Sequence, residues 1–567
     1  MSAKVRPLMV LSGLLAAACV DNVTGPPGAL CLANYSALAL AVGDFVALDP
    51  IPTQGCVIFP ANGSSTDSAE YLLVPQATTE VPNLSTTFRL TGQTAATALI
   101  AARQAGYAAA AAASVSPAER FHSLLREMER TRTYPGLSGA QAPFPTAAPA
   151  APVRVSVGDH RAFMVLASIT KGGYTTVNAT AQSVGQHVAI FVDDVVPAGG
   201  LTTTDIDALR DAFEQRLYPA DTVAFGRESD IDGNGLVIVL MTGVVNKLVT
   251  ATQCQTTGYV AGFFFGADID PATAYVVNDG EVFYTMVPDP SGTLSCNHSI
   301  AQVKRVVPGT LIHEFQHMIS YNHHVLQQPP AARKAEVLWL NEALSHYAEE
   351  LGGRAYLPDT ATFCNYIEGD LNNAAGYLSA SGSHPLVDTS GLGGLEERGA
   401  GWLFVRYLVD QLATDTSTAA QGVVTRQLDN TALTGTNNVA QLTGVSWATT
   451  AGAWALALWA SDLPGFTAKP SLRYKKWAFR TAYPKLSAYC GSLNPPIPIP
   501  STFPLSATAV PGTGVNVSGT MIAGSGATYQ RALQGLSGAK FDVLFSDPTG
   551  GQLKATVLPR LNVLRIR

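Results

Sequence analysis

The chain has few charged residues and no excess of basic ones. Only 14% of its 567 residues are Asp, Glu, Lys or Arg, and the formal net charge is −7. Proteins that bind nucleic acid neutralise phosphates with Lys and Arg, so this balance argues against nucleic acid as a partner. Hydrophobic residues make up 47% of the chain, which is ample for a packed core, and the length predicts about three or four domains.

Long hydrophobic runs are also missing, and the apolar stretch at the N-terminus is too short to span a membrane. Lys4 and Arg6 precede this stretch (Leu8–Leu15), and Ala16–Ala18 follow it, which is the pattern of an export signal. Cys19 comes next, as in a bacterial lipobox, where the cysteine is lipidated and becomes the new N-terminus. We therefore expect a cell-envelope lipoprotein held on a membrane by an N-terminal lipid anchor, or released from it. The alternative is an ordinary cleaved signal that precedes a cysteine by chance.

Cysteine pairs of the CxxC type are absent, so neither a structural zinc site nor a redox motif is expected. The chain has seven cysteines, and six remain when Cys19 is set aside. An even number in an exported protein predicts disulfides, although the sequence leaves their pairing open. Pairing between neighbours within the presumed domains would give Cys31–Cys56, Cys254–Cys296 and Cys364–Cys490.

The clearest chemistry in the chain is carried by two histidines four residues apart. His313 and His317 enclose Glu314 in the pattern HExxH. On a helix both imidazoles project from one face, at the spacing that holds one zinc ion, with Glu314 beside the metal as general base. The neighbouring residues are apolar, as in a core helix: Leu311, Ile312, Phe315, Met318 and Ile319.

A catalytic zinc site usually has three protein ligands and one open position. His323 follows His317 at the spacing of the extended metzincin motif. However, Ser320 stands where metzincins have glycine, and the sole methionine further along is Met521, too far away for a methionine turn. Glu342 is the better third ligand, because it lies in a second amphipathic segment from which a carboxylate would complete a His2Glu site.

These two motifs resemble those of the gluzincins, the thermolysin-like clan of zinc peptidases. The phrases HEFQHMI and WLNEALSHYAEE, which contain His313 and Glu342, are most similar to the hyicolysin family. The resemblance extends from about Arg154 to about Ala468. It implies an α+β fold with a zincin core of two subdomains, one catalytic Zn²⁺, and an exported endopeptidase that acts on protein or peptide substrates.

The resemblance also predicts supporting residues around the metal. In thermolysin-like enzymes an aspartate four residues after the ligand glutamate steadies a zinc histidine, but His346 stands there in this chain. Support would then come from His346 itself, Glu349 or Glu350. The oxyanion donor of related enzymes is a Tyr or His of the helical subdomain, and the sequence leaves these candidates open: Tyr347, Tyr356, His384 and Tyr407.

Periodicity and composition divide the chain into a core flanked by small β domains. The predicted parts are a signal peptide (1–18), a lipidated cysteine and tether (19–29), an N-terminal β domain (30–94), a helical segment with a Pro/Ala-rich linker (95–152), the zinc peptidase core (153–492), a Pro-rich linker (493–505) and a C-terminal β domain (506–567). The N-terminal region is either a propeptide that shields the site or a permanent accessory domain.

Within the core, a run of strands should precede the histidines. The predicted strands are 188–192, 236–241, 259–265 and 281–287, with a helix at 203–217. By resemblance, 258–266 is the edge strand that binds an extended peptide by β-augmentation; an ordinary buried strand is the alternative. After Glu349 the chain should be mostly helical to about Tyr489.

A loop before the second of these strands has the start of a calcium-binding pattern. Asp230, Asp232 and Asn234 place oxygen donors at alternate positions, as in the first half of an EF-hand loop. Met241 occupies the twelfth position, where a bidentate Glu is needed, and a strand follows instead of a helix. The loop is therefore either a Ca²⁺ site or a plain turn.

Other function classes fit parts of the sequence. A surface lipoprotein with an inactive peptidase core would bind polysaccharide or protein, yet the ligands and Glu314 are all retained. An aminopeptidase on the same scaffold would need an acidic anchor for the substrate amine, and no GxMEN-like motif occurs among the strands.

Overall fold

The structure is a computed structural model. It describes residues 31, 35–81, 84–92, 115–137, 154–168, 173–388, 393–526 and 528–567. The predicted signal peptide, Cys19 and the whole tether lie outside the described residues, as do parts of the predicted segment 95–152. Within the described ranges, no helix is long and apolar enough to cross a membrane.

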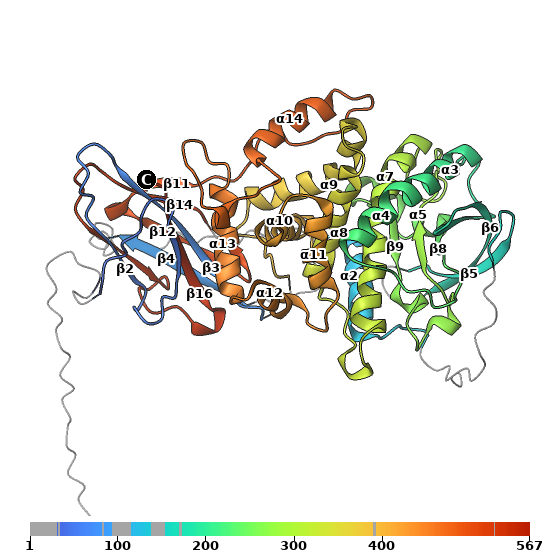
Figure 1. Cartoon of the computed structure of the whole chain (residues 1–567), viewed down its shortest axis with the longest axis horizontal. Coiled ribbons are helices and arrows are strands. Elements are labelled where there is room, and N and C mark those ends of the chain that lie inside the picture. The colour runs from blue at the N-terminus through green and yellow to red at the C-terminus, as the bar shows by residue number, and fades with distance from the viewer. Residues whose placement is uncertain are drawn as a thin grey trace, which may run out of the picture.

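Strands from the two ends of the chain form one β-sandwich. Its first sheet has the order β1-β16-β3-β14-β11, with β13 beside β3, and its second has the order β12-β4-β15-β2. The strands are β1 (Phe45–Leu48), β2 (Cys56–Phe59), β3 (Ala69–Ala77), β4 (Ser85–Gly92), β11 (Thr508–Pro511), β12 (Asn516–Ile522), β13 (Ser525–Gly526), β14 (Gln530–Gln534), β15 (Phe541–Ser546) and β16 (Pro559–Arg565). Figure 1 shows the sandwich at one end of the molecule.

The prediction of two separate β domains is therefore wrong. β3 pairs with β14 and β16, and β4 pairs with β12 and β15, so each sheet needs strands from both segments. The core between the sheets is also shared, because Phe59 and Phe88 pack with Phe541 and Phe545. Local alternation predicts a strand but carries no information about a partner at the other end of the chain.

A mixed sheet lies at the opposite end of the molecule (Figure 1), in the order β5-β6-β7-β8-β10-β9. Its strands are β5 (His160–Leu166), β6 (Tyr174–Val184), β7 (Val188–Asp193), β8 (Val237–Met241), β9 (Gly262–Phe264) and β10 (Val282–Thr285). β7, β8 and β10 are parallel, whereas β9 runs antiparallel to β10 at the edge. The predicted strands are all present, and 258–266 contains the edge strand as expected. β5 and β6 were not predicted.

The helices that follow β7 along the chain are α3 (Thr203–Ala212), a π-helical turn (Phe213–Leu217) that continues it into α4 (Tyr218–Ala224), α5 (Gly243–Asn246), α6 (Ala251–Thr257), α7 (Ile300–Tyr321), α8 (Leu338–Arg354), α9 (Thr360–Ser379), α10 (Leu395–Leu412), α11 (Thr418–Asp429), α12 (Gly435–Thr443), α13 (Trp447–Ala460) and α14 (Phe479–Gly491). The predicted helical stretch after Glu349 is thus present. Helices α8 to α13 lie between the sandwich and the mixed sheet, whereas α3 packs on β6 and β7 of the mixed sheet (Figure 1). α13 packs against β16 and joins the helices to the sandwich.

The helical segment predicted before the core contains the described helix α2 (Pro117–Thr131). Ser116 caps it through a capping box with Glu119, and Pro117 occupies the first turn, where its missing N–H costs nothing. Its apolar face is buried, and Phe121 lies edge-on to Phe263 of β9, with 5.1 Å between the ring centroids. α2 therefore lies between the mixed sheet and α8, which it also contacts (Figure 1).

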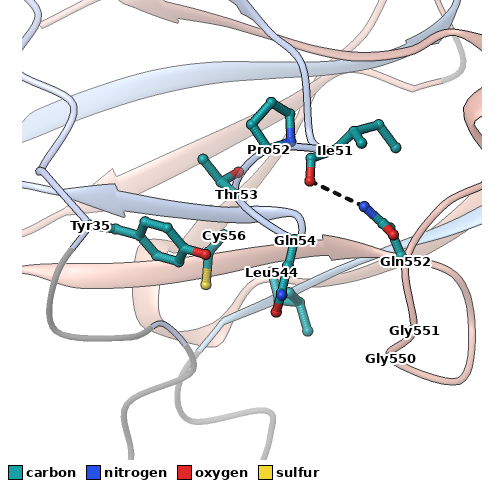
Figure 2. A pocket seen from close by; sticks show the side chains of 10 residues that line it. All are labelled: Tyr35, Ile51, Pro52, Thr53, Gln54, Cys56, Leu544, Gly550, Gly551 and Gln552. Atoms are coloured by element: carbon teal, nitrogen blue, oxygen red, sulfur yellow. Dashed lines mark hydrogen bonds between the residues drawn. The ribbon is translucent and has the colours of Figure 1, made fainter.

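The three disulfides pair neighbouring cysteines: Cys31–Cys56, Cys254–Cys296 and Cys364–Cys490. The last of them ties α9 to α14. Beside Cys56 the sandwich has a pocket of about 470 Å³ (Figure 2). Its lining contains no acidic, basic or histidine side chain, and Gln552 donates a hydrogen bond across it to the carbonyl of Ile51. This pocket therefore offers no side chain suited to acid–base catalysis at neutral pH or to binding a metal ion.

Candidate metal centre

Two packed helices bring the predicted zinc ligands together. His313 and His317 lie on α7 and Glu342 lies on α8, and their ligand atoms are all within 4.8 Å of one another. The Nε2 atoms of His313 and His317 are 3.1 Å apart. Nε2 of His313 lies 3.5 Å from Oε2 of Glu342, and Nε2 of His317 lies 3.7 Å from Oε1. All three residues are buried. His323 is not part of this group; it lies in the turn after α7, with Nδ1 3.6 Å from Asp429 Oδ2.

The donor set fits a zinc ion. Both carboxylate oxygens of Glu342 are buried without a hydrogen-bond partner among the described residues. Leaving a buried carboxylate without hydrogen bonds is costly, and a cation between it and the two imidazoles would satisfy it. Against the effect of burial, Arg398 and the two histidines lower the pKa of Glu342 well below its usual value, so the carboxylate is ionised. Two nitrogens and a carboxylate oxygen are ligands that zinc accepts.

Hydrogen bonds to Nδ1 fix the orientation of both histidines. Glu349 Oε1 lies 2.7 Å from Nδ1 of His313, and Asn341 Oδ1 hydrogen-bonds Nδ1 of His317. Ser345 Oγ is 3.0 Å from the same Nδ1 of His317. Because each Nδ1 is engaged, each Nε2 is left to face Glu342, which is the usual arrangement of metal-binding histidines.

His346 supports this shell indirectly. Its Nδ1 lies 3.1 Å from Glu349 and 3.0 Å from Asp370 of α9. His346 therefore helps to position Glu349, the carboxylate that contacts His313. Although burial opposes it, these two carboxylates raise the pKa of His346 to about 9. Glu350, the other candidate for this support, instead bonds Arg406 in the helical core, at 3.0 Å. Asn341 and Asp370 were missed, although Asn341 directly precedes the ligand Glu342.

Glu314 faces the edge strand. Its Oε2 accepts a 2.7 Å hydrogen bond from the backbone N–H of Phe264 in β9. Burial raises the pKa of Glu314 above its usual value, while the charges of His313 and Arg126 oppose that rise. The site therefore combines two histidines that can bind a metal, a buried carboxylate that can act as a base, and the edge of a strand that can pair with an extended peptide.

The four oxyanion candidates have different surroundings. The hydroxyl of Tyr347 donates to Gln421 at 3.0 Å, that of Tyr407 donates to the carbonyl of Ser471 at 2.9 Å, and Tyr356 stacks on Tyr366. His384 Nδ1 lies 2.8 Å from Glu397, whose neighbour Arg398 reaches the metal centre.

Arg398 of α10 was not predicted. Its Nη1 is 3.3 Å from Glu342 Oε2, and its Nε and Nη2 are buried with no hydrogen-bond partner in the described part of the chain. A cavity beside Glu342 and Arg398 holds about 10 Å³, roughly the space that one water molecule needs. The three ligand residues are buried, so little of the site is open to solvent in this structure.

Helix α2 lies beside this site, in contact with β9 and α8. Arg126 Nη2 donates a 3.1 Å hydrogen bond to the carbonyl of Phe264, next to the N–H that Glu314 binds. His122 lies one turn earlier and is partly buried. Burial lowers its pKa well below the usual value; the charge of Arg398 lowers the pKa further, and the charge of Glu342 opposes this. Shielding of the site by the N-terminal region was one of the two predictions for it, whereas the contact between Arg126 and Phe264 was not predicted.

The candidate calcium residues lie in a separate loop before β8. Asp230 and Asp232 approach Glu281, which was not predicted, whereas Asn234 is not in this group. The side-chain oxygen of Asn234 instead accepts a 2.6 Å hydrogen bond from the N–H of Leu236.

Comparison with known proteins agrees with this site at a coarse level. No family model matches the chain. The neutral metalloprotease ShpI of Staphylococcus hyicus is 26% identical over 205 residues, which cover 35% of this chain and 40% of that protein. The chain thus matches less than half of the relative's length. The similarity relates the chain to metalloproteases and does not distinguish among their families.

Proposed function

We propose that the chain is an exported zinc endopeptidase of the gluzincin type, similar to the hyicolysins, with a zincin core of two subdomains. The observation that carries the proposal is the convergence of His313, His317 and Glu342 beside Glu314, with both oxygens of Glu342 buried and lacking a hydrogen-bond partner among the described residues. The mixed sheet with α7 would form one subdomain, and the helices from α8 to α14 the other.

The proposed chemistry divides between the metal and the chain. Zinc, when bound, supplies a Lewis acid that polarises the scissile carbonyl and acidifies a water molecule. Glu314 takes a proton from the attacking water and passes it to the leaving amine. Glu349 and Asn341 keep the imidazoles oriented. The oxyanion donor would be one of the candidates Tyr347, Tyr356, His384 and Tyr407. Of these, His384 is connected to Glu342 through Glu397 and its neighbour Arg398.

The edge strand β9 is the proposed substrate platform. It pairs with β10 on one side, and the N–H and C=O of Phe264 both point to the other side, since Glu314 and Arg126 bind them. An extended peptide would add a strand there, which makes protein or peptide chains the substrate class. The lipid anchor at Cys19 would place this activity on the cell envelope.

The second candidate function is a surface lipoprotein that binds polysaccharide or protein through an inactive core. The peptidase is favoured because the chain retains the three metal ligands and Glu314, and because Glu349 and Asn341 contact the Nδ1 atoms of the two histidine ligands. Metal analysis of the purified protein combined with casein digestion by wild type and Glu314→Gln tests the choice. One zinc per chain and hydrolysis that depends on Glu314 would support the peptidase; a chain that takes up no zinc would contradict it.

A further inference from the structure

Three carboxylates converge at the start of two neighbouring strands, away from the zinc ligands. Asp230 and Asp232 lie in the loop that leads into β8, and Glu281 directly precedes β10. β8 and β10 are parallel neighbours in which Ile238 pairs with Val282, so their first residues lie side by side. This topology brings one ligand atom from each carboxylate within 4.8 Å of the others.

Glu281 is the residue that makes this cluster more than a turn. It is 1% exposed, its Oε1 accepts hydrogen bonds from Ser229 Oγ and from the N–H of Ile231, and its Oε2 is buried with no hydrogen-bond partner among the residues described. A buried, half-satisfied carboxylate beside two aspartates is unfavourable without a cation. Arg161, whose charge acts on Asp232, donates to the carbonyl of Asn278.

The donor set points to calcium. All of the donors are oxygens, which hard cations prefer, and Ca–O distances of about 2.3–2.6 Å allow two ligand oxygens to lie up to about 5 Å apart. The loop is shaped like a calcium loop: Asp230 accepts the N–H of Gly235 at 3.0 Å, Asp232 accepts the N–H of Asn234 at 3.1 Å, and Gly233 and Gly235 have φ of +71° and +72°. Magnesium demands stricter octahedral geometry and shorter distances, so it fits less well.

We propose that Asp230, Asp232 and Glu281 form a calcium site that ties the loop before β8 to the start of β10. Glu281 takes the role of the acidic ligand that the loop itself lacks at Met241. The site would brace the strands next to the edge strand β9, and it depends on neither zinc nor peptidase activity.

The test uses the full chain, loaded with zinc and freed of calcium on a chelating resin. Wild type should bind one Ca²⁺ by calorimetry, and its melting temperature should rise more with Ca²⁺ than with Mg²⁺. Asp230→Asn and Glu281→Gln should each weaken Ca²⁺ binding by roughly an order of magnitude while the zinc content stays unchanged, since Ca²⁺ affinity follows the ligand charge. Glu127→Gln, at an exposed carboxylate that pairs with Arg130 of its own helix, is the control and should bind as wild type does.

Asp230 is exposed, so its variant should fold even if Glu281→Gln does not. Wild type that neither binds Ca²⁺ nor gains stability from it would overturn the site, as would unchanged binding in Asp230→Asn.

The contacts of α2 support a second inference, which rests on the proposed peptidase function. At the free edge of β9 the carbonyl of Phe264 binds Arg126, and just beyond the strand the N–H of Gly266 donates to Glu129 Oε1 at 3.2 Å. Arg126 and Glu129 also pair with each other at 3.1 Å, with side chains 1% and 2% exposed. These side chains occupy backbone groups that an added peptide strand would need.

The same helix face reaches the catalytic residues. Arg126 is close enough for its charge to act on both Glu314 and His317, and His122, four residues earlier, interacts with the charges of Arg398 and Glu342. Residues four apart project from one helix face, so His122 and Arg126 lie on the same side of α2, the side that contacts β9.

The C-terminal end of α2 is held firmly against the core. Arg132 binds Asp270 through two hydrogen bonds of 2.7 and 2.6 Å, and the hydroxyl of Tyr321 donates to the same carboxylate at 2.6 Å. The hydroxyls of Tyr134 and Tyr321 are 3.0 Å apart. A bidentate pair of this kind, with the carboxylate buried, is among the stronger side-chain contacts.

We infer that α2 is an internal inhibitory segment that fills the substrate position along β9, so that hydrolysis requires its release. Residues 93–114 and 138–153, on either side of it, are rich in Ala and lie outside the described ranges. Cleavage in both would free α2 without loss of the N-terminal strands, because β1–β4 remain paired with β11–β16.

The experiment places a site for a specific protease in 93–114 and another in 138–153 of the full chain. After both cuts, casein hydrolysis by the zinc-loaded protein should rise at least tenfold over the uncut protein, and a synthetic peptide of residues 115–137 should reverse the gain. In the uncut chain, Arg126→Ala should raise activity. Arg130→Ala is the matched control, since Arg130 is exposed and pairs with Glu127 of its own helix, and it should leave activity unchanged.

The outcomes separate this inference from the proposed function. Equal hydrolysis by cut and uncut protein would overturn the inhibitory role and leave the peptidase intact. A cut protein that holds zinc, binds the 115–137 peptide and hydrolyses nothing would instead overturn the peptidase. Failure of the peptide to bind the cut protein at all counts against the inhibitory role.

Discussion

Glu349 Oε1 lies 2.7 Å from Nδ1 of His313, and this contact connects the metal centre to the helical half of the protein. The same oxygen is 3.1 Å from Nδ1 of His346, which in turn lies 3.0 Å from Asp370 on α9. A chain of buried polar contacts therefore runs from a predicted zinc ligand to a neighbouring helix. Thermolysin-like enzymes are expected to place an aspartate at the position of His346, and here the support comes from one turn further along α8.

Replacing Glu349 tests whether this contact orients the ligand. Glu349→Gln should keep the fold but weaken zinc binding by about 10- to 100-fold, the usual effect of losing the group that orients a metal-binding histidine. The measurement is competition with a chelator of known affinity. Glu368→Gln is the control, because Glu368 pairs with Arg305 on the protein surface and touches no ligand. Equal zinc affinity in both variants would refute the orienting role.

Zinc content of ligand variants tests the assignment of the three ligands. His313→Ala, His317→Ala and Glu342→Ala should each lose the single zinc, since each removes one of three protein ligands. His323→Ala should retain it, because His323 lies in the turn after α7 beside Asp429. Elemental analysis of all four proteins decides the matter, and zinc loss in His323→Ala alone would overturn the gluzincin assignment.

Much of the site could be predicted because its information is local. A four-residue spacing places His313 and His317 on one helix face, and the apolar neighbours predict that the helix is buried. The bounds of α2 could also be predicted, because Ser116 and Glu119 form a capping box that is visible in the sequence.

The rest depends on contacts between distant parts of the chain. Arg398 reaches Glu342 only because α10 packs on α8, and Glu281 meets Asp232 only because β8 and β10 are neighbours. The position of α2 against β9 and the pairing of β3 with β16 are of the same kind. Hydrophobic periodicity predicts which face is buried but not what buries it, so these features could not be derived from the sequence.

The shared sandwich predicts that a change in a C-terminal strand loosens an N-terminal one. Leu561 of β16 is fully buried and pairs in register with Pro75 of β3, so Leu561→Ala should cost about 2–5 kcal/mol. Hydrogen exchange of the β3 amides should then become faster. Leu558→Ala, at an exposed position just before β16, is the control. Unchanged exchange in β3 would mean that the two segments are independent after all.

Cys19 gives a prediction that rests on the sequence alone. Wild type expressed with its signal should incorporate labelled fatty acid and fractionate with membranes, because the apolar stretch and the small residues before Cys19 match a lipobox. Cys19→Ser should lose the label and enter the soluble fraction. A wild-type protein that carries no acyl group would refute the anchor.

Glu314 is predicted to act as general base and not as a structural residue. Glu314→Gln keeps the size of the side chain and its hydrogen bond with the N–H of Phe264 but removes its basicity. The variant should therefore fold, bind zinc and lose about 10²- to 10⁴-fold in hydrolysis, the typical contribution of general acid–base catalysis. Both proteins are assayed after α2 has been cut free, and equal zinc content and melting temperature must be shown first. A Glu314→Gln protein that meets these conditions and still digests casein at the wild-type rate would rule out the proposed mechanism.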